Sequence, residues 1–397
     1  MASPIQPARR IDDVHYDIRG PLARRAHALE QSGVEVLHLN IGNPSLFGLE
    51  TPQVLREAVA AQLPHADGYG PQLGIMPARE AIAAHAQRQG FDGVTFNDVI
   101  IGNGVSELVD VSLRSLLEPG DEVLIPAPDY PLWSASVILN NARPVYYPCP
   151  AELGFEPDIG ALEALITPNT RALVVINPNN PTGAVYAPAS LAGIARIATD
   201  HDLWVISDEV YDTQVWSGRH VPMAGLPGMA ARTLTVGSLS KSHAMTGSRL
   251  GWVAGPEAMI ARMITLATHT TYGVPGYIQE AGLFALRQGA AFEADIAAPF
   301  LRRRDMVLAA LTTQTAVRAT PPEGAMYVML DIRATGLSGN AFAARLLDEK
   351  GVAVMPGESF GQAAAGHVRV ALTLPDRAFE QAIAHLLEFA ATLARAA

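Results

Sequence analysis

Short apolar runs recur along the chain, and helical segments separate several of them. A helical pattern at 190–199, for example, lies between two such runs. Parallel strands need crossover connections of this kind, and strands covered by helices on both faces are apolar throughout. The alternation therefore predicts an α/β fold with a mostly parallel sheet between two layers of helices. The strand-like runs that carry this prediction are 99–101, 122–125, 144–147, 172–176, 203–207, 233–236 and 252–254.

The composition supports a large buried core. The chain has 397 residues, of which 49% are hydrophobic and 17% are charged, so we expect two domains and no long disordered region. The net charge of −11 argues against nucleic acid and against an anionic membrane surface as partners, because both attract basic patches.

Cysteine content and hydropathy narrow the class of protein further. Cys149 is the single cysteine, which excludes an intramolecular disulfide and a cysteine-based metal cluster within one chain. No apolar run approaches the ~18–20 residues of a membrane span, and residues 1–20 lack the apolar core of a secretory signal. We expect a cytoplasmic protein that has no membrane segment and no metal.

The last part of the chain has a different pattern. It combines strand-like runs at 325–330, 352–355 and 367–372 with a closing helix at 377–395. This predicts a separate small α+β unit, which the N-terminal segment joins. The expected organisation is an N-terminal segment at 1–50, a large domain at 51–295 and a small domain at 296–397.

One lysine lies at the end of a predicted strand among groups that suit a phosphate. Lys241 follows the run at 233–236, with Ser238 and Ser240 beside it and Arg249 eight residues later. A lysine amine is a useful nucleophile when its pKa is lowered or when it already forms an imine. Hydroxyls and an arginine are good phosphate ligands. The stretch therefore suggests a lysine bound to a phosphorylated aldehyde, which describes pyridoxal 5′-phosphate (PLP).

A second phosphate-binding feature lies earlier in the chain. The short strand at 99–101 leads through a glycine turn into a helix, and free amides at such a helix start attract anions. Glu107 stands where the dinucleotide fingerprint has its third glycine, which argues against a nicotinamide site. We interpret Gly104, Val105 and Ser106 as a phosphate cradle.

Other strand ends carry the remaining groups that PLP needs, and ligands of parallel sheets bind beyond those ends. The carboxylate of Asp208 would keep the ring nitrogen protonated, and Glu209 is the weaker candidate for this role. Asn180 and Tyr211 would donate hydrogen bonds to the phenolate oxygen, and Tyr130 would stack on the ring. The sequence thus predicts contacts for every part of the cofactor.

Four blocks of sequence give the chain a family resemblance. In these blocks and in their order, which spans nearly the whole chain, it resembles the class I, fold-type I PLP-dependent aminotransferases. The blocks are 177–183 (Asn-Pro-Asn-Asn-Pro-Thr-Gly), 208–211 (Asp-Glu-Val-Tyr), 238–241 (Ser-Leu-Ser-Lys) with Arg249 and Gly251, and 368–370 (Val-Arg-Val). Within the family, residues 16–21 and 39–44 resemble alanine-forming glutamate–pyruvate transaminases, and residues 240–247 resemble arginine–pyruvate transaminases.

The resemblance implies an architecture and further site residues. It implies a large domain with a mostly parallel seven-stranded sheet sandwiched by helices, and a small α+β domain that closes over the substrate. It implies a homodimer in which Tyr69 reaches the phosphate of the partner subunit. Arg369 would bind the substrate α-carboxylate in a bidentate manner, with Gly42 and Asn180 beside it.

The expected reaction is the transfer of an amino group from an L-amino acid to a 2-oxo acid. It would follow a ping-pong mechanism through a Lys241 imine, with Lys241 also moving the Cα proton. Another fold-type I reaction, such as β-elimination or amino-acid cyclisation, would use the same cofactor residues, and a non-catalytic PLP-binding module is the third alternative. His269 stands where some relatives carry a second arginine for a distal carboxylate, and the alternative is a helical histidine without a substrate contact.

Overall fold

The computed structural model describes residues 8–14, 20–311 and 316–394. Residues 16–19 of the segment 16–21, and Arg395 at the end of the predicted closing helix, lie outside these ranges.

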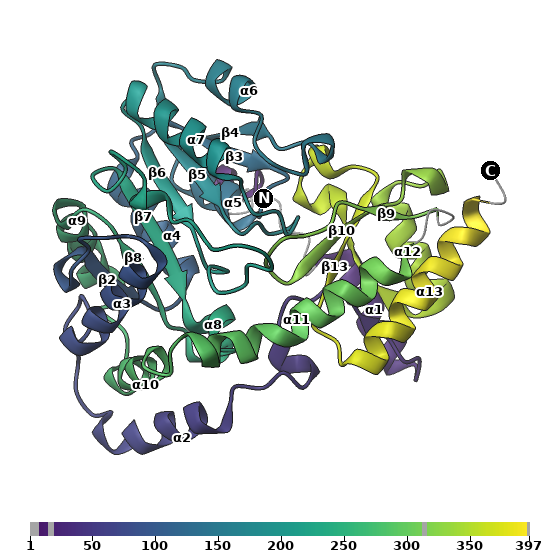
Figure 1. Cartoon of the computed structure of the whole chain (residues 1–397), viewed down its shortest axis with the longest axis horizontal. Helices are drawn as coiled ribbons and strands as arrows, with labels where there is room; N and C mark the ends of the chain where they lie inside the picture. Colours follow the sequence, from purple (N-terminus) through teal and green to yellow (C-terminus); the bar gives the residue numbers. More distant parts are fainter. Residues whose placement is uncertain (1–7, 15–19, 312–315, 395–397) are drawn as a thin grey trace, which may run out of the picture.

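A seven-stranded sheet forms the larger part of the fold (Figure 1). Its strand order is β2-β8-β7-β6-β5-β3-β4, and all neighbouring strands are parallel except the two pairs that β8 makes. The predicted fold class is therefore confirmed. The strands are β2 (Val99–Gly102), β3 (Glu122–Ala127), β4 (Arg143–Pro148), β5 (Thr170–Ile176), β6 (Trp204–Asp208), β7 (Thr233–Ser238) and β8 (Gly251–Ala254).

Helices cover both faces of this sheet because its strands are apolar on both faces. In β5, Val174 and Ile176 pack into one core, whereas Leu173 and Val175 pack into the core on the other face. The first core includes α4 (Val105–Leu116), α5 (Leu132–Leu139) and α9 (Glu257–Thr270), and the second includes α6 (Ile159–Ala164) and α7 (Pro188–Asp200). A further core joins α2 (Gln53–Gln62), α3 (Met76–Gln89) and α10 (Gly276–Leu286).

A smaller antiparallel sheet lies beside the large one (Figure 1). Its strands follow the order β12-β13-β10-β9, and the core beneath them includes side chains of three helices. These elements are β9 (Arg318–Ala319), β10 (Tyr327–Asp331), β12 (Met355–Pro356), β13 (His367–Ala371), α11 (Ala290–Ala310), α12 (Gly339–Lys350) and α13 (Asp376–Ala394).

The N-terminal segment packs onto this smaller part. Strand β1 (Leu37–His38) pairs in parallel with β11 (Val352–Ala353), and Ala26 of α1 (Pro21–Gln31) packs on Leu347 of α12. The predicted strand at 352–355 is therefore two short strands, because the chain pairs first with β1 and then, from Met355, with β13.

The predicted domain division stays a prediction. Its boundary between residues 295 and 296 falls inside α11, which is one continuous helix. Within the described part of the chain, no helix combines the length and the apolar character that crossing a membrane requires. The cytoplasmic location also stays a prediction.

Candidate active site

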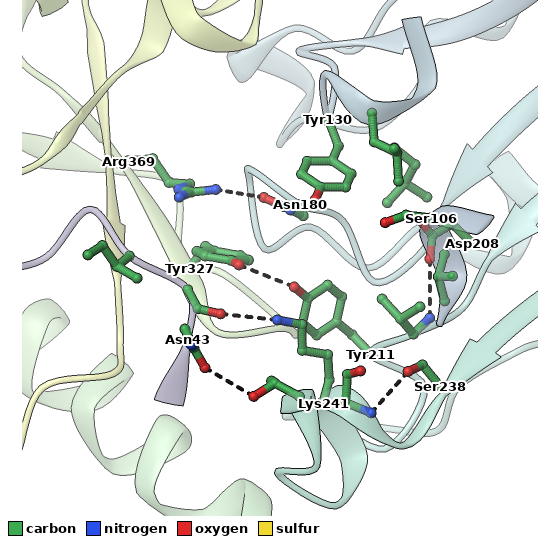
Figure 2. A pocket seen from close by; sticks show the side chains of 18 of the residues that line it. Asn43, Ser106, Tyr130, Asn180, Asp208, Tyr211, Ser238, Lys241, Tyr327 and Arg369 are labelled. Carbon is green, nitrogen blue, oxygen red and sulfur yellow. Dashed lines mark hydrogen bonds between the residues drawn. The ribbon is translucent and has the colours of Figure 1, made fainter. Parts of the chain in front are cut away.

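A cavity of about 310 Å³ lies at the carboxyl ends of the parallel strands. Ile176, Asp208 and Ser238 line it, and they are the last residues of β5, β6 and β7. Figure 2 shows how side chains from these strands and from the smaller sheet face one another across the cavity. Its described walls consist of Asn40, Ile41, Gly42, Asn43, Val105, Ser106, Tyr130, Leu132, Ile176, Asn180, Asp208, Val210, Tyr211, Ser238, Ser240, Lys241, Thr246, Arg249, Tyr327 and Arg369.

Lys241 lies in α8 (Leu239–Ser242), the short helix that directly follows β7. Ser238 caps this helix, because its Oγ accepts a hydrogen bond from the Ser240 amide at 3.0 Å. Its hydroxyl also donates to the Leu250 carbonyl at 3.1 Å. Lys241 Nζ donates to the carbonyl of Gly42 at 3.0 Å, so the amine lies between the large sheet and the N-terminal segment.

Asp208 and Glu209 follow each other in sequence but serve different surroundings. Asp208 lines the cavity, and its Oδ2 accepts a hydrogen bond from Trp133 Nε1 at 3.1 Å. Burial raises the pKa of Asp208 to about 6, although the Trp133 hydrogen bond acts to lower it. Glu209 instead accepts from Ser207 and lies 2.8 Å from His220 Nε2. Of the two candidate carboxylates, only Asp208 faces the cavity.

The start of α4 forms a cradle with Arg249. Gly104 precedes the helix at φ +83°, and a Cβ atom there would collide with the Arg249 guanidinium. Val105 and Ser106 line the cavity in the first helical turn, which has no side-chain cap. Arg249 is held by the carbonyls of Thr246 at 3.1 Å and Asn103 at 3.3 Å. Uncapped amides beside a guanidinium make this end of the cavity suited to an anion.

Arg369, on β13, provides a cation on the opposite side of the cavity. It is 2% exposed, and its Nη atoms donate to Asn180 Oδ1 and to the Asn40 carbonyl, each at 3.0 Å. The guanidinium stacks over the rings of Tyr327 at 4.2 Å and Phe360 at 4.7 Å. Its Nε is buried and has no hydrogen-bond partner. The guanidinium group of Arg369 is therefore held rigidly, and its N–H donors face Asn180 and the cavity.

Sequence reasoning missed Tyr327, which contacts several of the predicted residues. The hydroxyl of Tyr211 donates to that of Tyr327 at 3.2 Å. A Cβ atom on Gly42 would overlap the Tyr327 hydroxyl, so the glycine permits this close approach. The apolar run at 325–330 indicated a strand but not which residue faces the site. Asn43 and Thr246 were also missed; the Thr246 hydroxyl donates to Asn43 Oδ1 at 3.1 Å.

Tyr69 and His269 lie away from the cavity within this chain. Tyr69 is 91% exposed, and its ring packs edge-on against Tyr272 at 5.1 Å. His269 is exposed on α9, where its Nδ1 donates to the Thr265 carbonyl at 2.6 Å. Tyr130, by contrast, lies on the cavity wall after β3, and its ring-stacking role stays a prediction.

Comparison with known proteins gives one consistent result. A family model described as "Aminotransferase class I and II" matches residues 34–386. The arginine–pyruvate transaminase AruH of Pseudomonas aeruginosa is 40% identical over 381 residues, covering 96% of this chain and 94% of that protein. The glutamate–pyruvate aminotransferase AlaA of Escherichia coli is 36% identical over 394 residues, covering 94% of each. The solved alanine aminotransferase of Pyrococcus furiosus superposes with a TM-score of 0.92 at 30% identity, covering 98% of this chain and 100% of that one.

Proposed function

The chain belongs to the class I and II aminotransferases, and we propose that the cavity around Lys241 is its active site and that pyruvate is its amino acceptor. The protein is a PLP-dependent transaminase that acts between an amino acid and a 2-oxo acid. One observation carries the site assignment: Lys241, Asp208 and Arg369 line one cavity. They come from separate elements of the fold, namely α8 after β7, β6 and β13, so the fold itself brings them together.

The residues of the cavity fit PLP. The uncapped start of α4 and Arg249 would hold the phosphate, together with Ser106 and Ser238. Asp208 is buried with only neutral hydrogen-bond donors, Trp133 Nε1 and the Val210 amide, and its pKa is raised by burial. A protonated ring nitrogen would supply the missing cation.

The remaining residues supply binding and proton transfer. When bound, PLP provides an aldehyde that takes up the amino group and a ring that withdraws electrons. Arg369 orients the substrate by holding its α-carboxylate. Asn180 accepts a hydrogen bond from the Arg369 guanidinium, and Gly42 lines the same cavity. The Lys241 amine takes up and returns the proton at the substrate Cα. Tyr211, whose hydroxyl donates to Tyr327 in this structure, would donate instead to the phenolate oxygen of PLP, and Tyr130 would cover the ring.

The charges of the cavity wall support a substrate with one carboxylate. Among the described residues that line the cavity, the cations are Lys241, Arg249 and Arg369. Each already has a proposed partner, so the distal carboxylate of glutamate or aspartate would find no further cation on the part of the wall that these residues of one chain form. Pyruvate and alanine carry a single carboxylate. Of the relatives above, two are named for pyruvate, one together with arginine and one together with glutamate, and the third is named for alanine.

A half-reaction panel tests this substrate proposal. Single L-amino acids are mixed with the PLP-loaded enzyme without an acceptor, and the absorbance change of the cofactor gives the rate for each. L-Alanine is expected to react at least about tenfold faster than L-glutamate at equal concentration, because a distal carboxylate would remain unpaired. Lys241→Ala is the blank. A faster reaction with glutamate would contradict the proposal, and release of a side-chain fragment would favour β-elimination.

An exposed apolar face supports the homodimer. We call it the α2–α10 face, and it consists of Val54, Leu63, Tyr69, Met76, Tyr272 and Phe284, which are all between 38% and 91% exposed. They lie on or beside helices that pack together, α2, α3 and α10. Exposed apolar patches mark interaction sites. We propose that a second copy covers this face and that Tyr69 enters the partner's cavity, at its phosphate end.

A hybrid dimer tests whether Tyr69 acts across the interface. Lys241→Ala and Tyr69→Ala chains are co-expressed with different tags, and the mixed dimer is isolated. A two-fold dimer of this kind would contain one site with native Lys241 and a native Tyr69 from its partner. We expect about half of the wild-type activity per dimer, well above that of either parent. A hybrid no more active than the Tyr69→Ala parent would exclude the trans contact.

A further inference from the structure

Buried and partly buried charged side chains gather on the side of the segment 208–212 that faces away from the cavity. Asp208 and Tyr211 line the cavity, whereas Glu209 and Asp212 line a small separate void of about 20 Å³. Some side chains of the segment therefore face the cavity, and others face a group of charged residues. We call this group the buried charge cluster; it consists of His85, Glu209, Asp212, His220 and Glu293.

His85 links three elements within the cluster. It lies on α3, and its Nε2 donates to Oδ2 of Asp212 at 2.6 Å. Its Nδ1 is 3.6 Å from Oε1 of Glu293, in the first turn of α11. His85 is 4% exposed and Glu293 is 5% exposed, and the imidazole also packs edge-on against Trp252 of β8 at 6.0 Å. Asp212 is therefore fixed by a side chain that the surrounding helices and sheet hold in place.

The charges in the cluster are consistent with an ion pair. Burial acts to lower the pKa of His85, but the charge and hydrogen bond of Asp212, with help from Glu293, raise it to about 10. Burial acts to raise the pKa of Asp212, and His85 lowers it below its usual value. Breaking a buried pair by removing one partner leaves an uncompensated charge, which costs about 3–5 kcal/mol.

Two further cationic or titratable groups face His85. Arg88 Nη2, on the same helix, is 3.2 Å from Nδ1 and would be the donor to a neutral imidazole. His243, two residues after Lys241, is buried, and burial lowers its pKa below the usual value. It is held by the Ala285 carbonyl at 3.1 Å and by Ser242 at 2.8 Å. The cluster therefore adjoins the lysine-bearing helix as well.

The second arm of the cluster holds the residue next to Asp208. Glu209 lies 2.8 Å from His220 Nε2 and accepts from the Met223 amide at 3.1 Å. Burial acts to lower the pKa of His220, whereas the charge of Glu209 raises it above the usual value. Residues 209 and 212 are thus both anchored, and each directly follows a residue that lines the cavity, Asp208 or Tyr211.

We propose that His85 and Asp212 form an ion pair that positions Asp208 and Tyr211 for the reaction. The inference rests on the proposed roles of Asp208 and Tyr211 in the active site. Neither His85 nor Asp212 lines the cavity, so both act through the segment that they hold. A displacement of about 1 Å at reacting groups can cost about a hundredfold in rate, so the anchor matters for the rate as well as for stability.

The test compares Asp212→Asn and His85→Gln with a matched control, Glu122→Gln. Glu122 is also a buried carboxylate with an ion pair, to Arg143, but it begins β3 at the opposite end of the sheet. In the PLP-loaded dimer we expect kcat to fall about tenfold to a hundredfold for both test variants, with KM little changed. The circular dichroism of the cofactor absorbance band, which reports how the ring is held, is expected to decrease. Glu122→Gln is expected to lower the melting temperature only.

Two outcomes would overturn the inference. One is a pair of test variants that melt as early as Glu122→Gln but keep the wild-type kcat and cofactor band, which is the behaviour of a purely structural pair. The other comes from the wild-type holoenzyme and needs no variant to fold: in a histidine NMR titration His85 must stay protonated where an ordinary histidine is neutral, above about pH 8. A neutral His85 there excludes the ion pair.

Asp208→Asn separates this inference from the proposed active site. If Asp208→Asn lowers kcat and Asp212→Asn does not, the positioning inference alone is wrong. If Asp208→Asn leaves kcat unchanged, the proposed role of Asp208 is wrong, and the inference fails with it.

Discussion

Lys241→Ala is expected to abolish transamination, with kcat reduced by about ten-thousandfold or more. The amine of Lys241 is the group proposed to hold the cofactor and to move the Cα proton, and Ala retains neither ability. Its Nζ is held by the Gly42 carbonyl at 3.0 Å inside the cavity. Turnover with the best donor from the half-reaction panel measures the effect, and the melting temperature shows that the variant is folded.

The chain offers a matched control because it contains lysine at only two positions, 241 and 350. Lys350 ends α12, where its Nζ donates to Glu388 Oε2 at 3.0 Å. Lys350→Ala is expected to keep full activity. Borohydride reduction of the loaded enzyme, followed by peptide mass analysis, is expected to place the cofactor on Lys241. A label on Lys350, or turnover retained by Lys241→Ala, would contradict the assignment.

The sequence predicted the part of the site that lies at strand ends. Asp208 and Ser238 follow apolar runs, and parallel strands bring their carboxyl ends to one edge, so local patterns were sufficient to group them. Lys241 follows by three residues in a short helix that Ser238 caps. The helix start at Gly104 needed only a glycine turn after a strand.

The residues that were missed depend on contacts between distant segments. Tyr327 approaches Gly42 and Tyr211 only because β10 pairs with β13, a register that periodicity does not reveal. The partnership of His85 with Asp212 joins residues 127 positions apart, and a lone histidine in a helical pattern carries no signal for it. Tyr69 was named from the family resemblance, and its proposed role stays a prediction because it requires a second copy of the chain.

Asp208→Asn is expected to lower kcat/KM by about a hundredfold to a thousandfold, because the cofactor ring would lose the carboxylate that keeps its nitrogen protonated. The amide is nearly the same size, and its oxygen can still accept from Trp133 Nε1. The fold should therefore remain intact. Half-reaction rates with the preferred donor measure the change in chemistry, separately from product release.

The same substitution is expected to stabilise the cofactor-free protein above neutral pH. The pKa of Asp208 is raised from 3.8 to about 6, so the folded state holds this proton more tightly than the unfolded state. The resulting stability is fully present below pH 3.8 and is lost as the pH rises through about 6. Above that pH the buried carboxylate costs at most roughly 3 kcal/mol, and Asn removes this cost. Melting temperatures of both cofactor-free proteins, measured across this pH range, test the sign.

Glu122→Gln is the opposing control, since it also replaces a buried carboxylate by an amide. Burial acts to raise the pKa of Glu122, but hydrogen bonds from Thr167 and Arg143 lower it below its usual value. Its ionised form therefore stabilises the fold at neutral pH, and Gln should lower the melting temperature there without changing the half-reaction rate. If Asp208→Asn instead behaved like Glu122→Gln, less stable above neutral pH and fully active, Asp208 would be an ordinary structural carboxylate. Opposite signs at the two ends of the sheet would show that the site retains a destabilising carboxylate for its reaction.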